Sequence, residues 1–187
     1  EITHVISMLP ENPASYMFHF PNLHLVKEQA ALMGLPLVEK KTKGEKEKEL
    51  GDIEDALKML SGKIGGIVTG ALASNYQKQR IDAICERLGL ASIAPLWHRD
   101  PAEYMRSMLK DGFEVIFVGV AAPPLDDKWL GRRLDEKAIE ELVELNRRFG
   151  IHVGGEGGET ESLVLDCPMF SKRIEIVRAE KNWNAKE

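Results

Sequence analysis

The stretch IGGIVTGALAS at residues 64–74 decides the fold class of this chain. Its first six residues form an apolar run with β-branched side chains, which is typical of a buried strand, and Gly70 and Ala71 form a turn. Ser74 then begins a helix, because serine is a favoured N-cap, and Gly89 ends it. The inward face of that helix has apolar residues at helical spacing, namely Ile81, Ile84, Cys85 and Leu88. The stretch therefore predicts a strand-turn-helix unit.

Patterns typical of strands and helices alternate on both sides of this unit. Further strands are expected at residues 2–8, 35–38 and 113–119, and further helices begin near Asn22, Ile53 and Asp100. Alternation at this spacing indicates parallel strands joined by crossover helices. The predicted fold is therefore α/β, with a Rossmann-like parallel sheet and helices on both of its faces.

The pattern changes after residue 119. A Pro-Pro pair at residues 123–124 interrupts it, and Asp135 then caps a long amphipathic helix that ends at Gly150. Two further strands are expected, near residues 162–166 and 172–179. We therefore expect an α/β domain at residues 1–119 and a smaller α+β subdomain at residues 120–187.

Composition and charge disfavour several classes of protein. With a net charge of −5 and a sequence pI near 5.6, the 187-residue chain lacks the basic balance of a general nucleic-acid binder. No apolar run approaches the roughly 18 residues that a transmembrane helix needs, so we expect no membrane association. Its two cysteines form no C-x-x-C pair and its five histidines show no metal-ligand spacing, which disfavours zinc and fits a reducing cytoplasm.

The segment GGEGGETE at residues 154–161 combines four glycines with three carboxylates ahead of an apolar run. Glycines let a ligand approach the main chain, and clustered carboxylates repel one another unless a cation compensates their charge. One interpretation is an exposed acidic turn. The other is a functional site, in which Glu159 and Glu161 share one face of a strand because side chains alternate with period two. The composition of the segment favours a site, and its spacing does not choose the chemistry.

Three segments follow expected strands at the edge of the sheet where ligands bind. In open α/β sheets this edge lies beyond the carboxyl ends of the strands, and the segments are residues 7–8, 70–74 and 94–97. Lys78 and Arg80 lie on the helix that Ser74 begins, so an anion such as phosphate can bind near its N-terminus. The alternative is that Ser74 is an ordinary N-cap and that both cations are solvated.

Motifs along almost the whole chain resemble those of the diphthine–ammonia ligases, which are N-type ATP pyrophosphatases of the PP-loop superfamily. The resembling segments are residues 7–22, 42–47, 70–80, 94–97, 129–132 and 155–170, the last being the most specific. The resemblance implies a PP-loop, HUP-like version of the α/β fold. It also implies an S-G-G-x-D-S phosphate loop, which is absent from residues 1–187. We expect that loop, with its strand and helix, upstream in the complete gene product.

The resemblance implies the ATP-dependent amidation of diphthine, a modified histidine of translation elongation factor 2, to diphthamide. In that reaction the diphthine carboxylate attacks ATP to form an acyl-adenylate and pyrophosphate, and ammonia, supplied as ammonium, then releases AMP. Mg²⁺ is expected to neutralise the pyrophosphate, although the sequence suggests no ligands for it. The alternatives are a PP-loop enzyme that adenylates another carboxylate or an RNA acceptor, and a degenerate, non-catalytic nucleotide-binding module. A homo-oligomer is compatible with each.

Residue roles also follow from the resemblance. The residues expected to bind ATP are Ser7, Met8, Gly70, Ala71, Ser74, Tyr76, Gln77 and Arg80. Those expected to bind the diphthine substrate are Trp97, Trp129, Arg132, Gly157 and Gly158, and the expected catalytic residues are Glu156, Glu159 and Glu161. The glutamates would bind ammonium, take its proton or hold Mg²⁺. The tryptophans would contact the trimethylammonium group of diphthine, with ordinary packing as the alternative.

Overall fold

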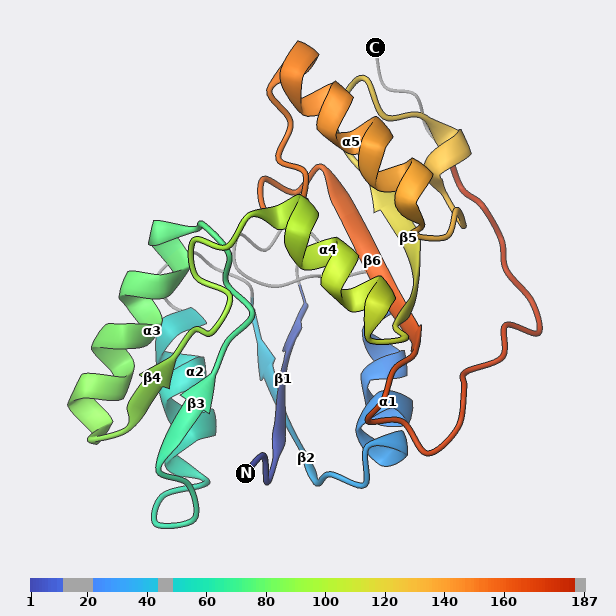
Figure 1. The fold of residues 1–187 in the computed structure, drawn as a ribbon. Helices are drawn as coiled ribbons and strands as arrows, with labels where there is room; N and C mark the ends of the chain where they lie inside the picture. The colour runs from blue at the N-terminus through green and yellow to red at the C-terminus, as the bar shows by residue number, and fades with distance from the viewer. Residues whose placement is uncertain (12–21, 44–48, 184–187) are drawn as a thin grey trace. The chain divides into compact units, whose positions relative to one another are not determined.

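The computed structural model describes residues 1–11, 22–43 and 49–183, and its chain divides into two compact units, unit 1 at residues 1–98 and unit 2 at residues 99–187 (Figure 1). The parts of the expected motifs that fall at residues 12–21 and 44–48 lie outside the described residues. The boundary that we expected after residue 119 falls inside unit 2. The helix and strand just before it pair and pack with elements that follow it.

Unit 1 alternates strands and helices, as the sequence predicts. Its elements are β1 (Val5–Pro10), the 3-10 helix η1 (Leu23–Leu25), α1 (Val26–Leu32), β2 (Leu37–Thr42), α2 (Glu49–Lys58), β3 (Gly66–Val68), α3 (Asn75–Leu88) and β4 (Ala91–Ile93). β1 pairs with β2 and β3 with β4, both in parallel. The α/β class is confirmed, and the described strands of this unit form two two-stranded parallel sheets.

Local signals place the main helices of unit 1, with one exception. The Ser74 hydroxyl accepts a hydrogen bond from the Gln77 amide at 3.4 Å, and Gly89 ends α3 in the left-handed conformation. The predicted cap at Asn22 is wrong. Asn22 has a φ of 58° and makes no capping bond, and α1 begins only at Val26. A left-handed residue lacks the extended backbone that an N-cap uses.

Unit 2 contains α4 (Pro101–Lys110), β5 (Glu114–Val120), the 3-10 helix η2 (Asp127–Trp129), α5 (Glu136–Phe149) and β6 (Thr160–Asp166). β5 and β6 pair antiparallel, so the strand expected to close the parallel series belongs to a different sheet. Asp100 caps α4 and Asp135 caps α5, as predicted, through bonds of 2.8 and 2.7 Å to the amides of the third residue of each helix.

The second strand expected in this region, at residues 172–179, is not formed. These residues lie within the described part of the chain and contain no strand, although the Ile174 amide donates a hydrogen bond to the Leu165 carbonyl at 2.8 Å. Val177 is 96% exposed. Alternation of apolar and charged residues predicts a strand only where a neighbouring strand pairs with it and covers its apolar face.

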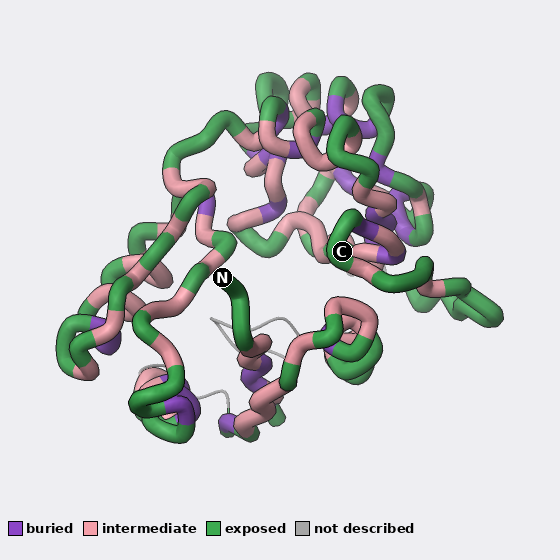
Figure 2. The backbone as a smooth tube through the Cα atoms, turned by 60° about the horizontal axis from the view of Figure 1, so that its bottom comes forward, coloured by how far each residue is buried: buried purple, intermediate pink, exposed green. Residues whose placement is uncertain are grey.

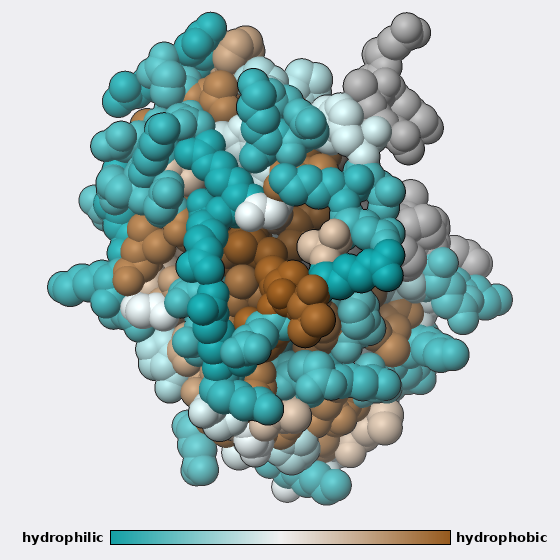
Figure 3. Space-filling view, turned by 90° about the vertical axis from the view of Figure 1, so that its right-hand side faces the viewer, coloured by the Kyte–Doolittle hydropathy of each residue, from teal (hydrophilic) through white to brown (hydrophobic). Residues whose placement is uncertain are grey.

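Buried and exposed segments alternate along the helices, as amphipathic helices require (Figure 2). The core of unit 1 consists of Met8, Ile53, Ala56, Leu57 and Ile84. The core of unit 2 consists of Ala102, Met105, Val115, Phe117, Leu125, Trp129, Leu134, Ala138, Ile139, Leu142, Ile151 and Val153. Apolar side chains also reach the surface among hydrophilic ones (Figure 3).

Candidate active site

Two segments are expected to form the nucleotide side of the site. The prediction that Ser7 and Met8 follow the first strand is wrong, because they lie inside β1 (Val5–Pro10), where both are buried. Gly70 and Ala71 follow β3, and a Cβ at Gly70 would meet no atom within 4 Å, so the main chain there is open to a ligand. The turn at Gly70 and Ala71 can therefore present backbone groups to a ligand.

At the start of α3, Arg80 folds back over the first turn. Its guanidinium carbon lies 3.4 Å from the centre of the Tyr76 ring, and its Nη1 donates a hydrogen bond to the Tyr76 carbonyl at 3.3 Å. This stacking holds a permanent positive charge near the N-terminus of the helix. The Ser74 hydroxyl serves as the N-cap of the same helix. Of the expected ATP-binding residues, the structure brings Ser74, Tyr76, Gln77 and Arg80 together in this turn.

Lys78, a second cation near the start of this helix, is neutralised. Its Nζ lies 2.5 Å from Asp82 Oδ2, while Asp82 Oδ1 accepts a hydrogen bond from the Ser92 hydroxyl at 2.7 Å. The Lys78 hydrogen bond, followed by that of Ser92, lowers the pKa of the Asp82 carboxyl. The Lys78 ammonium also lies 5.6 Å from the centre of the Trp97 ring. Trp97 is half-buried. The contact between its indole ring and the Lys78 ammonium is a cation–π contact, the type of contact by which aromatic rings bind trimethylammonium groups.

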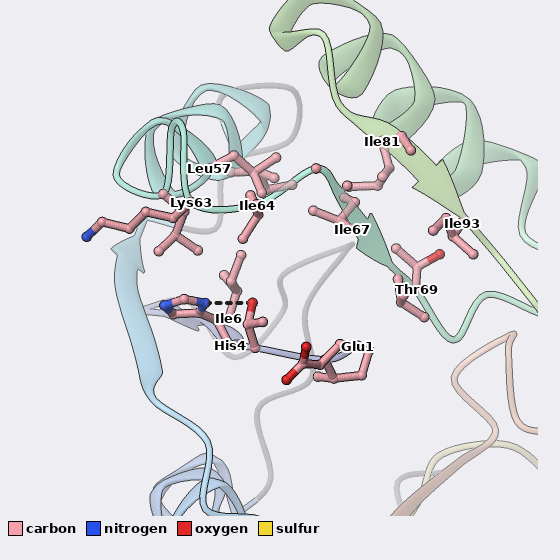
Figure 4. Close-up of a pocket in the computed structure, with 18 of the residues that line it drawn as sticks. Glu1, His4, Ile6, Leu57, Lys63, Ile64, Ile67, Thr69, Ile81 and Ile93 are labelled. Atoms are coloured by element: carbon pink, nitrogen blue, oxygen red, sulfur yellow. Dashed lines mark hydrogen bonds between the residues drawn. The ribbon is translucent and has the colours of Figure 1, made fainter.

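A cavity of about 590 Å³ lies between β1 and β3, which flank it but pair with β2 and β4 rather than with each other. Figure 4 shows His4 and Ile6 on the β1 side and Ile64, Ile67 and Thr69 on the β3 side. Most of the lining is apolar, and Met8 is the residue from the expected ATP-binding set that contributes to it. Such walls suit an apolar group better than a triphosphate, which needs cations or clustered N–H donors.

In unit 2, Trp129 is part of the core. The side chain packs edge-on against Phe117, with ring centres 5.2 Å apart, and the Arg132 guanidinium covers a face of the indole at 4.3 Å. Arg132 also forms an ion pair with Glu141, and this contact lowers the pKa of the Glu141 carboxyl. The arrangement matches the packing alternative that the sequence left open for this tryptophan.

The glycine-glutamate segment forms a tight loop between α5 and β6. Gly155 has a φ of 72°, and a Cβ at this position would collide with the Thr160 hydroxyl. A Cβ at Gly157 would lie 2.6 Å from a carboxylate oxygen of Glu159. Gly158, by contrast, has open space around it. Gly155 is therefore required for the loop to close on itself. A side chain at Gly157 would have to displace the Glu159 carboxylate, and Gly158 leaves room for a ligand.

Glu159 closes this loop. Its Oε1 accepts a hydrogen bond from the His152 amide and its Oε2 one from the Gly157 amide, both at 2.8 Å. The expected sharing of a strand face with Glu161 is not formed, because β6 begins only at Thr160 and the Glu159 side chain turns back into the loop. Glu156 and Glu161 are half-buried, and Glu161 lies opposite Gly119 of β5. The three carboxylates thus have different surroundings.

His152 also shapes this loop, a role that the sequence analysis did not predict. Its Nδ1 accepts hydrogen bonds from the Gly154 amide at 3.1 Å and from the Glu156 amide at 3.4 Å. The sequence does contain a pattern that predicts this contact. His152 has a hydrogen-bond acceptor close to its main chain and stands two residues before Gly154, the spacing at which asparagine and aspartate side chains bond to a backbone amide.

Within residues 1–11, 22–43 and 49–183, no three His, Cys, Asp or Glu side chains converge as metal ligands would. In the same ranges, no helix combines the length and the apolar character needed to cross a bilayer.

Comparisons with known proteins agree with the two-unit division. The family model of the diphthamide synthase N-terminal domain matches residues 1–92, and that of the diphthamide synthase C-terminal domain matches residues 100–187. A diphthine–ammonia ligase of Rattus norvegicus is 37% identical over 180 residues, and one of Homo sapiens is 36% identical over 180 residues. Each alignment covers 89% of this chain and 67% of the relative. A diphthine–ammonia ligase of Schizosaccharomyces pombe is 44% identical over 114 residues, which cover 61% of this chain and 19% of the relative.

Proposed function

The chain belongs to the diphthamide synthase family, and from this premise we propose how its two units divide the work of a ligase. The protein is a ligase that forms a carbon–nitrogen bond by the ATP-dependent amidation of diphthine, in diphthamide biosynthesis. The observation that carries this function is the similarity of both units to that family, at 36–37% identity over most of the chain.

Amidation of a carboxylate needs activation, because a carboxylate is a poor electrophile. In the proposed sequence a diphthine carboxylate oxygen attacks the α-phosphorus of ATP, which forms the acyl-adenylate and releases pyrophosphate. Ammonia, formed when ammonium loses a proton, then attacks the acyl carbon, and the carbon–oxygen bond to AMP breaks. The enzyme must therefore hold a polyanion at one place and deprotonate a cation at another.

Unit 1 suits the polyanion. We propose that Ser7, Met8, Gly70 and Ala71 present main-chain groups to the adenosine. Ser74, Tyr76, Gln77 and Arg80 lie at the N-terminus of α3, where amide dipoles and a stacked guanidinium favour phosphate. Mg²⁺ bound together with ATP would supply positive charge that stabilises the pyrophosphate leaving group.

Unit 2 suits the ammonia step. We propose that Glu156 and Glu161 bind ammonium and accept its proton, and that Glu159 holds the loop through the bonds that its two oxygens accept from the His152 and Gly157 amides. Gly157 and Gly158 are exposed, so an acyl group can approach the loop there. In this proposal Arg132 supports Trp129 within the core.

The proposed protein substrate is translation elongation factor 2 that carries diphthine. Trp97 is the proposed contact for its trimethylammonium group, because an indole face attracts quaternary cations and this side chain is only half-buried. Trp97→Ala should raise the KM for the modified factor and leave that for ATP nearly unchanged. An equal rise in both constants would instead indicate that Trp97 only packs.

The function is tested by incubating protein expressed from the complete reading frame with ATP, ammonium and diphthine-bearing elongation factor 2. AMP release and diphthamide formation should both depend on the factor. AMP release without the factor would favour another acceptor, and no AMP release would favour a non-catalytic module.

The glutamate roles are tested on the same assay. Glu156→Gln and Glu161→Gln should each lower kcat about 100-fold, the scale of a lost general base. Glu175→Gln, at an exposed position of the same unit, is the matched control and should leave kcat unchanged. If both loop variants kept wild-type kcat, the proposed proton acceptor would have to lie elsewhere.

A further inference from the structure

We infer that His152 is a positioning residue of the ligase site: its neutral imidazole holds the main chain of the glycine-glutamate loop and so sets the position of Glu156. The inference rests on the proposed function of that loop. It concerns a side chain that does not itself contact the reacting atoms.

The imidazole acts as a short internal cap. Nδ1 accepts hydrogen bonds from the Gly154 amide at 3.1 Å and from the Glu156 amide at 3.4 Å, so one ring atom binds two main-chain amides of the loop. The His152 carbonyl accepts the Gly155 amide at 2.9 Å. Together with the bond from the His152 amide to Glu159, these contacts tie one residue to four points of the loop.

The core of unit 2 holds His152 in place. Its two neighbours, Ile151 and Val153, are buried members of that core. The Asn146 side chain also donates a hydrogen bond to the Ile151 carbonyl at 2.6 Å, which links the loop to the last turn of α5. The imidazole therefore projects from a backbone that is fixed on both sides.

Two amide donors at Nδ1 require that this nitrogen carry no proton, so the ring is the tautomer protonated at Nε2. Without the acceptor, the amides of Gly154 and Glu156 lose their partner and the loop gains freedom. Glycines on both sides of Glu156 offer no side-chain restraint of their own. The Glu156 carboxylate would then occupy the reactive position for a smaller fraction of the time.

The test compares His152→Asn with His152→Gln in the amidation assay. Asparagine places an oxygen close to the position of Nδ1, whereas glutamine places its polar atoms near Nε2. We expect His152→Asn to keep kcat within roughly threefold of wild type and His152→Gln to lower it about 10- to 100-fold, the scale of a misplaced catalytic group. The KM for ATP should not change. Equal kcat values for the two variants would overturn the inference.

The control is His24→Gln, at an exposed histidine of unit 1, which should leave all constants unchanged. Thermal unfolding of each variant separates a misplaced loop from an unfolded unit. The expected outcome is a lower kcat for His152→Gln at nearly the wild-type Tm, and a kcat that falls only in proportion to folded protein would contradict it.

A second measurement does not depend on activity. Imidazole ¹⁵N NMR at neutral pH should find His152 protonated at Nε2 with an unprotonated, hydrogen-bonded Nδ1. A proton on Nδ1 would refute the inference even if the enzyme is active. If the protein fails to form diphthamide but shows this signature, the proposed function fails while the loop geometry is upheld.

Discussion

Units 1 and 2 hold their parts of the site in different ways. In unit 2 the glycine-glutamate loop follows Ile151 and Val153, two residues of a large core to which the fully buried Ala138, Ile139 and Leu142 of α5 also belong. In unit 1 the candidate ATP-binding residues lie beside two small sheets and an apolar cavity, where Val68 and Ile93 are 51% and 47% exposed. The proposed proton-transfer loop is thus fixed by packing, whereas the proposed nucleotide segments depend on caps, stacking and ion pairs.

This difference separates the two demands of the reaction. A proton acceptor must be held accurately, and a packed core supplies that accuracy because shifted side chains lose contacts at once. A segment that admits and releases a nucleotide needs less rigidity, and local hydrogen bonds can open separately. Substitutions in the two cores, in the glycine-glutamate loop, at two helix caps and at Asp82 test the comparison.

The largest difference is expected in the cores. Leu142→Ala should destabilise unit 2 by about 4 kcal/mol, whereas Leu57→Ala in unit 1 should cost about 2 kcal/mol, the two ends of the range for buried leucine. Leu142 is enclosed, while Leu57 lines the cavity and already lacks neighbours on that side. Hydrogen exchange resolved by unit would measure both changes, and equal losses would break the comparison.

A smaller effect is expected within the loop itself. Gly155→Ala and Gly158→Ala both force alanine into a left-handed conformation, at about 1–2 kcal/mol. Only the first also meets another side chain, that of Thr160. Gly155→Ala should therefore lower Tm more than Gly158→Ala does. Gly158→Ala should lower amidation as well, because its methyl group would fill the open space at which the acyl group is proposed to approach the loop. Wild-type amidation in Gly158→Ala would contradict that approach.

A smaller difference in stability is expected between variants that remove the N-caps of two helices. Asp135→Ala removes a bond of 2.7 Å at the start of α5, and Ser74→Ala removes one of 3.4 Å at the start of α3. We expect about 1–2 kcal/mol for the first and about 0.5 kcal/mol for the second, within the usual range of N-cap losses. Chemical denaturation of the two variants measures the difference, and a larger loss at Ser74 would contradict the view of α3 as the more loosely held helix.

The smallest effect is expected at Asp82, whose side chain is 39% exposed. Because its bonds to Lys78 and Ser92 lower its pKa in the folded state, its charge stabilises unit 1 at neutral pH. That contribution is complete above the unfolded pKa of about 3.9 and disappears as the pH falls through the lower folded value. Asp82→Asn should therefore cost up to about 1 kcal/mol at pH 7. The difference from wild type should vanish in strong acid; a difference that persists there would point to packing rather than charge.

Much of this organisation could be predicted from local pattern. The start and end of α3, the caps of α4 and α5 and the α/β class depend on interactions among residues a few positions apart, which the sequence displays directly. The cap at Asn22 failed because its own backbone conformation, which a residue type does not reveal, is left-handed. The strand at residues 172–179 failed because pairing needs a partner strand.

The candidate site shows the same limit. The unusual composition of residues 154–161 marked a site, and the resemblance to a ligase family supplied its chemistry. Neither the composition nor the resemblance predicted that Glu159 bonds to backbone amides, that Lys78 is paired with Asp82, or that Trp129 lies in the core. Each of these depends on where a side chain turns after the chain has folded.

The sequence by itself determined the alternation of strands and helices, the ends of the main helices and the family to which the chain belongs. These rest on local hydrogen bonding and on residue order. Only the tertiary structure decided the division at residue 98, the antiparallel pairing of β5 with β6 and the distinct surroundings of the three loop glutamates. The physical reason is that packing and pairing join residues far apart in sequence, and their free energy depends on shape that no short pattern contains.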